Sequence, residues 1–435
     1  MKKVTRFCFL LMISIVLVFA GFLTGCHQPM NPNLDFDVPN SAFDTPFASR
    51  EVLQEIAQVE GNVDWRVARF FALATLEGFR HTQGWEGAVL SQYPIIINYA
   101  GTRQPRFYEF RVMRGNVEIG AIVCVAREDE GSPVQFVIPF ATLGTTGDVM
   151  SVTDIGERRR TTRELSDYAR AIDILESLTP EEFETFGIPS QEAFEAMLSH
   201  HRANVERNKN FWQQVTESQD MILSLTEQEI VAKFRDDGMV SNAIIVGQWH
   251  NRLYRWYNKR NWRIIGEPGT WCGPWVVYFI TLGLGAESGF PGIVPTVNNT
   301  NQLRAFYNIF ERRIGTGPRT FTGLDNGLTH YTRFTINHWA PNNWNHYFNS
   351  IDNHLRATQL PVISRRWPIV GAGGFHYRLI TGTKAITFWQ NSFFPWARYW
   401  TEAFYHIQDN GSDGHHRWEP SDSFWLWDVG RVQRR

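Results

Sequence analysis

The prediction of fold and function for the second half of the chain depends on one stretch, Thr270-Trp271-Cys272-Gly273-Pro274-Trp275. This stretch precedes an apolar run, Val276–Ile280. Loop-forming residues precede it and glycines follow it, so the pattern predicts a buried helix that begins near Cys272. Unpaired backbone N–H groups at a helix start favour negative charge and lower the pKa of a thiol there. They can also hold an oxyanion formed during acyl transfer. A cysteine that merely packs at the helix start fits the same pattern.

A histidine and an asparagine, residue types that can activate a cysteine thiolate, follow this cysteine in the sequence. The β-like run Pro361–Ser364 precedes a loop and then His376, where an apolar strand is predicted to begin. His376 would accept the thiol proton. Asn391 would accept a hydrogen bond from the imidazole and fix its tautomer. A packed strand histidine and a turn asparagine between strands are the structural alternatives.

This order, with the cysteine before a helix, the histidine on a strand and the asparagine on the next strand, resembles the papain-like cysteine peptidases. The likeness is greatest to the bacteriocin-processing peptidase-like branch, in which a Pro-Val-Ile strand precedes the strand that starts with the histidine. The resemblance implies a catalytic triad of Cys272, His376 and Asn391. It also implies peptide hydrolysis through a thioester acyl-enzyme, with no cofactor and no metal ion.

The segment before the cysteine departs from this family at one position. Papain-like enzymes carry a glutamine there as an oxyanion donor, and this chain has Gly266. Gln248 is the candidate replacement, and the backbone N–H of Cys272 would be the other donor. Loss of one such donor typically costs about 10²–10³ in rate. The sequence therefore also allows a slow or inactive enzyme.

The N-terminus has the form of an export signal. A basic start, Met1-Lys2-Lys3, precedes the apolar run Phe9–Phe22, which is short for a membrane span. The closing residues Leu23-Thr24-Gly25-Cys26 resemble the bacterial lipobox. That resemblance implies cleavage before Cys26, acylation of Cys26 and a lipid anchor in the bacterial cell envelope. An ordinary secretory signal is the alternative.

Composition limits the classes of partner. The formal net charge is −2 and no long basic stripe occurs, which argues against nucleic-acid binding. Apart from the signal and Cys26, only Cys124 and Cys272 remain, so a disulfide scaffold is not expected. Cys124 lies in an alternating run and is predicted to be a core residue.

Four histidines recur at steps of eight residues: His330, His338, His346 and His354. On a helix, successive members would lie about 80° apart, so a shared metal site is not expected. Nothing in the composition indicates an oligomeric state.

The expected fold class is α+β, with more than one domain. Helices are predicted at 49–60 and 64–81, then β-like runs at 95–99, 107–113, 117–126 and 134–140. Tyr108–Val112 and Ile119–Val123 loosely resemble the pro-domain of streptopain-like peptidases. The capping box Thr226–Glu229 predicts another helix start. The divisions are a signal peptide at 1–25, a tether at 26–45, a pro-domain-like α+β module at 46–155, a helical connector at 156–238 and a papain-like domain at 239–435.

The sequence thus predicts a membrane-anchored bacterial cysteine peptidase that acts on a peptide or protein substrate. Two alternatives remain open. One is amidase or transglutaminase-like acyl transfer on cell-wall peptides, because those enzymes share the Cys–His pair. The other is a non-catalytic adhesin or glycan-binding lipoprotein on a degenerate peptidase fold, with which the 17 tryptophans and the missing glutamine are compatible.

Overall fold

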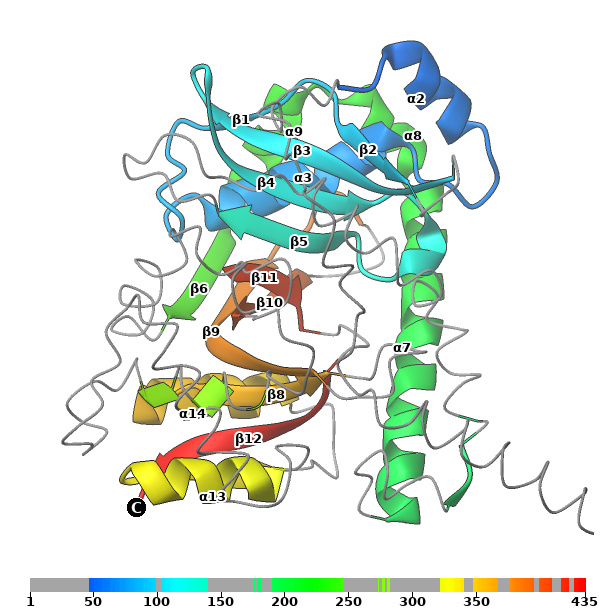
Figure 1. Ribbon diagram of the computed structural model, residues 1–435. Coiled ribbons are helices and arrows are strands. Elements are labelled where there is room, and N and C mark those ends of the chain that lie inside the picture. Colours follow the sequence, from blue (N-terminus) through cyan, green and yellow to red (C-terminus); the bar gives the residue numbers. More distant parts are fainter. Residues whose placement is uncertain are drawn as a thin grey trace, which may run out of the picture.

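A computed structural model describes residues 47–98, 104–139, 176, 178–180, 190–245, 273, 276–277, 280–281, 321–339, 347–366, 376–394, 399–408, 416–421 and 426–435. They form an α+β fold, as the sequence predicts, and the helices pack on one large antiparallel sheet (Figure 1). The signal peptide, Cys26 and the tether lie outside the described residues, as do Gln248 and Cys272.

The buried helix α3 (Trp65–Phe79) lies at the centre of the N-terminal half. Asp64 caps it, since its carboxylate accepts a hydrogen bond from the Arg66 backbone N–H at 2.8 Å. Every residue from Val67 to Phe79 is buried. A helix that is apolar all round must be covered on every side. The shorter helix α2 (Arg50–Ala57) precedes it and is capped by Ser49.

The sheet has the order β1-β3-β4-β5-β11-β10-β9-β8-β12-β7, with β2 paired to β3 and β6 paired to β9. A single register pair, Trp418 with Val137, joins the N-terminal strands to the C-terminal ones through β11 and β5. The strands are β1 (Val89–Leu90), β2 (Ile95–Asn98), β3 (Pro105–Arg114), β4 (Val117–Val125), β5 (Val134–Pro139), β6 (Met239–Ile245), β7 (Phe334–Trp339), β8 (Val362–Arg366), β9 (His376–Phe388), β10 (Trp400–Gln408), β11 (His416–Pro420) and β12 (Leu426–Arg434).

Strand β9 organises the C-terminal half. One of its edges pairs with β10. Its other edge is shared, because β8 pairs with its first residues and β6 pairs with 382–388. Figure 1 shows β9 curving between these neighbours.

The remaining described helices cover the sides of the sheet. Helix α9 starts with the predicted capping box, in which Thr226 Oγ1 accepts from the Glu229 N–H and Glu229 accepts from the Thr226 N–H. The long helix α7 stands beside the sheet (Figure 1) and Trp212 Nε1 donates to the Gly131 carbonyl at 2.8 Å. These helices are η1 (Glu128–Glu130), α7 (Gln191–Glu217), α8 (Gln219–Ser224), α9 (Glu227–Asp236), α13 (Phe321–Tyr331) and α14 (Tyr347–Thr358).

One aromatic core unites parts of the chain that the sequence analysis assigns to three separate units. The Phe70 ring of α3 lies 5.3 Å from that of Phe234 in α9 and 4.8 Å from that of Phe393. It also stacks on Trp400 of β10, with centroids 6.1 Å apart. The predicted N-terminal module therefore shares its core with the connector and the C-terminal region, because α3 has no polar face to expose.

We expect Phe70→Ala to lower the free energy of unfolding by about 3–5 kcal/mol, since it leaves a cavity in this shared core. Phe47→Ala is the matched control, because Phe47 is 49% exposed and its loss should cost no more than about 0.5 kcal/mol. Urea unfolding followed by tryptophan fluorescence measures both. Two separate transitions, with only one shifted by Phe70→Ala, would contradict a shared core.

Candidate active site

The residues that follow Cys272 are helical wherever the structure describes them. Gly273, Val276, Val277, Ile280 and Thr281 are all helical and buried. The Thr281 hydroxyl donates to the Val277 carbonyl at 2.9 Å, the contact of a helical threonine with the preceding turn. The predicted buried helix is confirmed at these positions, while the place of Cys272 itself lies outside the described residues.

Strand β9 begins at His376, as the sequence predicts. The backbone of His376 pairs with Arg366 of β8, and Val362 pairs with Ile380. The Pro-Val-Ile strand therefore lies antiparallel beside the strand that the histidine starts. Both strands belong to the middle of the sheet, where β8 also pairs with β12.

The structure does not bring His376 and Asn391 together. Strand β9 runs for 13 residues without a turn, which is about 40 Å of strand length, and Asn391 follows its far end. The expectation that Asn391 lies on the strand after that of His376 is wrong. The strand continues because β6 supplies a partner for 382–388, and Gly382 leaves room for this: an added Cβ would lie 2.7 Å from the Ile244 carbonyl oxygen.

Asn391 instead shapes the turn between β9 and β10. Its Oδ1 accepts from the backbone N–H groups of Phe393 and Phe394, both at 3.3 Å, and its Nδ2 donates to the Phe394 carbonyl. Beside it, the Ser392 N–H and hydroxyl donate to the Asp237 carboxylate at 2.9 and 3.1 Å. These contacts direct Phe393 and Phe394 into the core, which matches the structural alternative of a turn asparagine.

A buried lysine on β9, which the sequence analysis did not single out, is the most unusual polar group near these strands. Lys384 is 1% exposed, and its Nζ donates to Ser241 Oγ at 2.5 Å and to Thr82 Oγ1 at 2.6 Å. The Nζ also lies 4.9 Å from the centre of the Phe79 ring. Burial lowers the pKa of Lys384 to about 8. The sequence carried a signal for this, since Lys384 interrupts the alternation of inward residues Ile380, Ile386 and Phe388.

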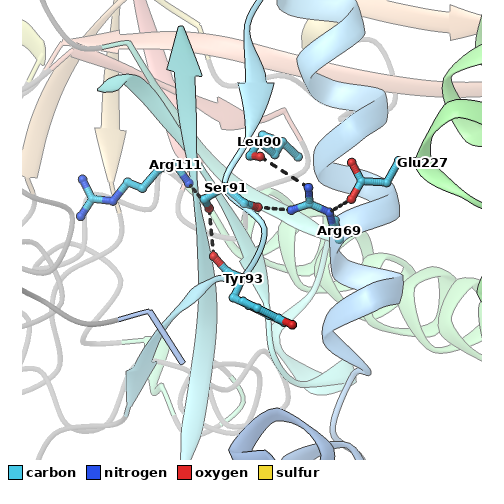
Figure 2. A network of polar contacts seen from close by, with 6 residues as sticks. All are labelled: Arg69, Leu90, Ser91, Tyr93, Arg111 and Glu227. Atoms are coloured by element: carbon cyan, nitrogen blue, oxygen red, sulfur yellow. Dashed lines mark hydrogen bonds and ion pairs between the residues drawn. The ribbon is translucent and has the colours of Figure 1, made fainter. Parts of the chain in front are cut away.

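A second polar network ties α3 to its neighbours (Figure 2). The buried Arg69 guanidinium donates to Glu227 Oε1 at 2.5 Å and to the carbonyls of Ser91 and Leu90. The Ser91 hydroxyl accepts from the Arg111 N–H at 3.1 Å and donates to the Tyr93 carbonyl at 2.9 Å. Each cationic group in this network has an anionic partner, because Arg111 also pairs with Glu109 at 2.6 Å. The network therefore acts as a clamp between α3, α9 and the strands.

The other predicted residues lie as follows. Cys124 is fully buried in β4, as expected, and burial raises the pKa of its thiol well above the usual range. His330, His338 and His354 belong to α13, β7 and α14, respectively, and His346 lies outside the described residues. Burial lowers the pKa of His354 to about 4. Within the described ranges, no group of three or more His, Cys, Asp and Glu side chains is placed to hold a metal ion.

Comparisons with protein-family models, with curated proteins and with solved structures find no match to this chain. Among the helices that the structure describes, none has the length and apolar composition needed to cross a membrane.

Replacing Asn391 with alanine should lower the free energy of unfolding by about 1–3 kcal/mol, because two buried N–H groups lose their acceptor. The neighbouring exposed Gln390 gives the control, and Gln390→Ala should change it by less than about 0.5 kcal/mol. Urea unfolding measures both variants, and the alkylation rate of Cys272 is recorded in parallel. Unchanged stability with much slower alkylation would restore Asn391 as the partner of His376.

Proposed function

We propose that this chain is an exported, lipid-anchored bacterial cysteine peptidase that cleaves peptide bonds with Cys272 and His376. The observation that supports it best is β9, which begins at His376 and pairs with the Pro-Val-Ile strand β8. The buried helical residues after Cys272 supply the second element on which the family resemblance rests.

In the proposed reaction His376 accepts the proton of the Cys272 thiol, and the thiolate attacks the peptide carbonyl carbon. The carbon–nitrogen bond breaks, and the amine leaves with the proton that His376 returns to it. Water, deprotonated by His376, then attacks the thioester and regenerates the thiol. Oxyanion stabilisation is assigned to the Cys272 N–H and to Gln248. Because Asn391 follows the far end of β9, the proposal rests on a dyad.

The proposal keeps the C-terminal region as a papain-like catalytic unit and changes the role of the N-terminal part. A pro-region that is removed must leave a folded enzyme behind. Here Phe70 and Phe71 of α3 pack on Phe394 and Trp400 of the C-terminal region. We therefore assign the N-terminal part to the mature protein. The substrates are peptides or proteins that reach the cell envelope, to which acylated Cys26 would hold the enzyme.

One observation favours the non-catalytic alternative as a second candidate. Trp389 and Tyr399 are 55% and 57% exposed, and their ring centroids lie 6.0 Å apart beside the turn that joins β9 to β10. Exposed Trp and Tyr side chains recur at binding surfaces because they combine an apolar face with a polar tip. Such a pair could stack on the rings of a glycan. Amidase or transglutaminase-like acyl transfer would use the same Cys272 and His376.

Iodoacetamide at neutral pH should modify Cys272 at least 100-fold faster than Cys124, since only an activated thiolate reacts quickly. Cys124 is the internal control, because burial raises its thiol pKa. Peptide mapping by mass spectrometry gives both rates. His376→Ala should slow the modification of Cys272, and Cys272→Ala should abolish turnover of a fluorogenic peptide library while Cys124→Ser retains it. Equal, slow modification of both thiols together with no turnover would favour the binding alternative.

The lipid anchor has its own test. Cys26→Ser should move the protein from the membrane fraction to the soluble extract of the envelope, or should block signal processing. Immunoblots of the fractions and mass spectrometry of the mature N-terminus report the outcome. A mature N-terminus other than Cys26, without acyl groups, would replace the lipid anchor with an ordinary secretory signal.

A further inference from the structure

We propose that Ser241 and Lys384 form a second acyl-transfer centre, a serine–lysine dyad that accepts carboxylic esters. This centre is independent of Cys272 and His376 and goes beyond the proposed peptidase function. Serine nucleophiles with a lysine base are an established variant of triad chemistry. The chemistry requires a hydroxyl within hydrogen-bond reach of an amine that can exist in its neutral form.

The register of β6 on β9 builds this pair into the sheet. Ser241 pairs with Ile386, and Ala243 pairs with Lys384. Directly opposed residues of an antiparallel pair share a face, so Ser241 and Lys384 are diagonal neighbours on one face. Their side chains meet with Ser241 Oγ 2.5 Å from Lys384 Nζ. The pair thus stands on two hydrogen-bonded strands, which hold a catalytic geometry more precisely than a loop.

Close packing of α3 completes the arrangement. The Ser241 hydroxyl donates to the Gly78 carbonyl at 2.9 Å. A Cβ on residue 78 would lie 2.3 Å from Ile386 Cδ1, so glycine allows the helix to approach the strand this closely. Thr82, just after the helix, accepts from the Lys384 amine at 2.6 Å and acts as a positioning residue.

The surroundings of Lys384 suit a base. Its amine contacts two hydroxyls and an aromatic ring, and among the described residues no carboxylate forms an ion pair with it. Burial therefore disfavours the ammonium form and lowers the pKa of Lys384 to about 8. Half of the molecules then carry a neutral amine near pH 8. A structural role would be served by methionine of similar volume without burying a charge.

Titratable groups on the packed elements have partners of their own. Glu402 of β10 accepts from Thr75 Oγ1 at 3.3 Å, and His406 Nδ1 lies 2.8 Å from Thr381 Oγ1. Glu77 of α3 pairs with Arg80, and His81 lies 3.1 Å from Glu86. Lys384 is therefore the group whose titration should control the hydroxyl of Ser241.

The serine is open to a substrate, whereas the lysine is not. Ser241 is an exposed residue, as are its neighbours Val240 and Asn242, while Lys384 is 1% exposed. An acyl group would therefore reach Ser241 through the exposed part of this residue. An exposed nucleophile in front of a desolvated base is the order that acyl transfer needs.

The reaction balances with water as the second reactant. Once Lys384 is neutral, the Ser241 hydroxyl turns from the Gly78 carbonyl and donates to Nζ, which accepts its proton while Oγ attacks the ester carbonyl carbon. The carbon–oxygen bond of the ester breaks, and the alcohol leaves with the proton from Lys384. Water, deprotonated by Lys384, then attacks the acyl-serine and releases the carboxylic acid, and the proton returns to Ser241.

The test uses the full mature chain carrying Cys272→Ala, so that thiol chemistry does not contribute. A fluorophosphonate probe should phosphonylate Ser241, with a rate that rises with pH and half-maximal effect near pH 8, and the chain should hydrolyse p-nitrophenyl acetate. Peptide mapping identifies the modified residue. Ser392, an exposed serine bonded to a carboxylate, is the internal control and should stay unmodified.

Three variants in the same background decide the outcome. Ser241→Ala should abolish labelling and ester hydrolysis. Lys384→Met should slow labelling at least 100-fold, with its fold checked by circular dichroism. Thr82→Val should shift the pH midpoint of labelling. Absence of label at Ser241, or equal label in Lys384→Met, overturns the proposal. Should Lys384→Met fail to fold, a pH-independent labelling rate in the unsubstituted lysine chain overturns it instead.

Discussion

The burial of α3 is the constraint on which the rest of the described structure depends. This helix has no polar face, so both halves of the chain must cover it. Residues of β4 and β5 pack on one side, and Phe234, Phe393 and Trp400 pack on another. The buried charged residues of the helix have partners: the Arg69 guanidinium binds Glu227 and two carbonyls, and Glu77 pairs with Arg80. Removal of either half of the chain would expose a helix that water cannot solvate.

Strand β9 then decides which side chains meet. His376 is the first residue of this uninterrupted strand and Asn391 follows its last residue, so the length of β9 separates the two positions along the chain. The same continuity lets β6 pair along 382–388, and this pairing brings Ser241 to Lys384 across 143 positions of sequence. The continuity of β9 therefore separates two members of the predicted triad along the chain. It also creates the Ser241–Lys384 contact, which no local sequence motif predicts.

Local sequence patterns predicted the helices, strands and caps that depend mainly on neighbouring residues. Apolar spacing of three to four predicted α2 and α3, alternation predicted β2 to β5 within about two residues, and the capping box predicted the start of α9. The strand that begins at His376 was also predictable, because a glycine-rich loop precedes an apolar alternating run. The pairing of distant strands was not predictable in this way. The spacing of apolar residues along the sequence does not reveal that β6 pairs with β9 or that β5 pairs with β11. Gly382 illustrates the point, because its role is to make room for the Ile244 carbonyl of the paired strand β6.

The buried cations of this fold show why Lys384 differs from a structural residue. Arg378 and Arg417 are almost fully buried, and both bind the Glu419 carboxylate, at 2.8 and 2.7 Å respectively. Arg69 and Arg111 likewise have carboxylate partners. A buried charge paired in this way keeps its ionised form and serves the fold. Lys384 is buried as deeply, yet its amine contacts two hydroxyls and an aromatic ring, so burial disfavours the ammonium form and lowers the pKa of Lys384 to about 8. A neutral amine within hydrogen-bond distance of an exposed serine can act as a base. This property distinguishes the Ser241–Lys384 pair from the buried ion pairs of the sheet.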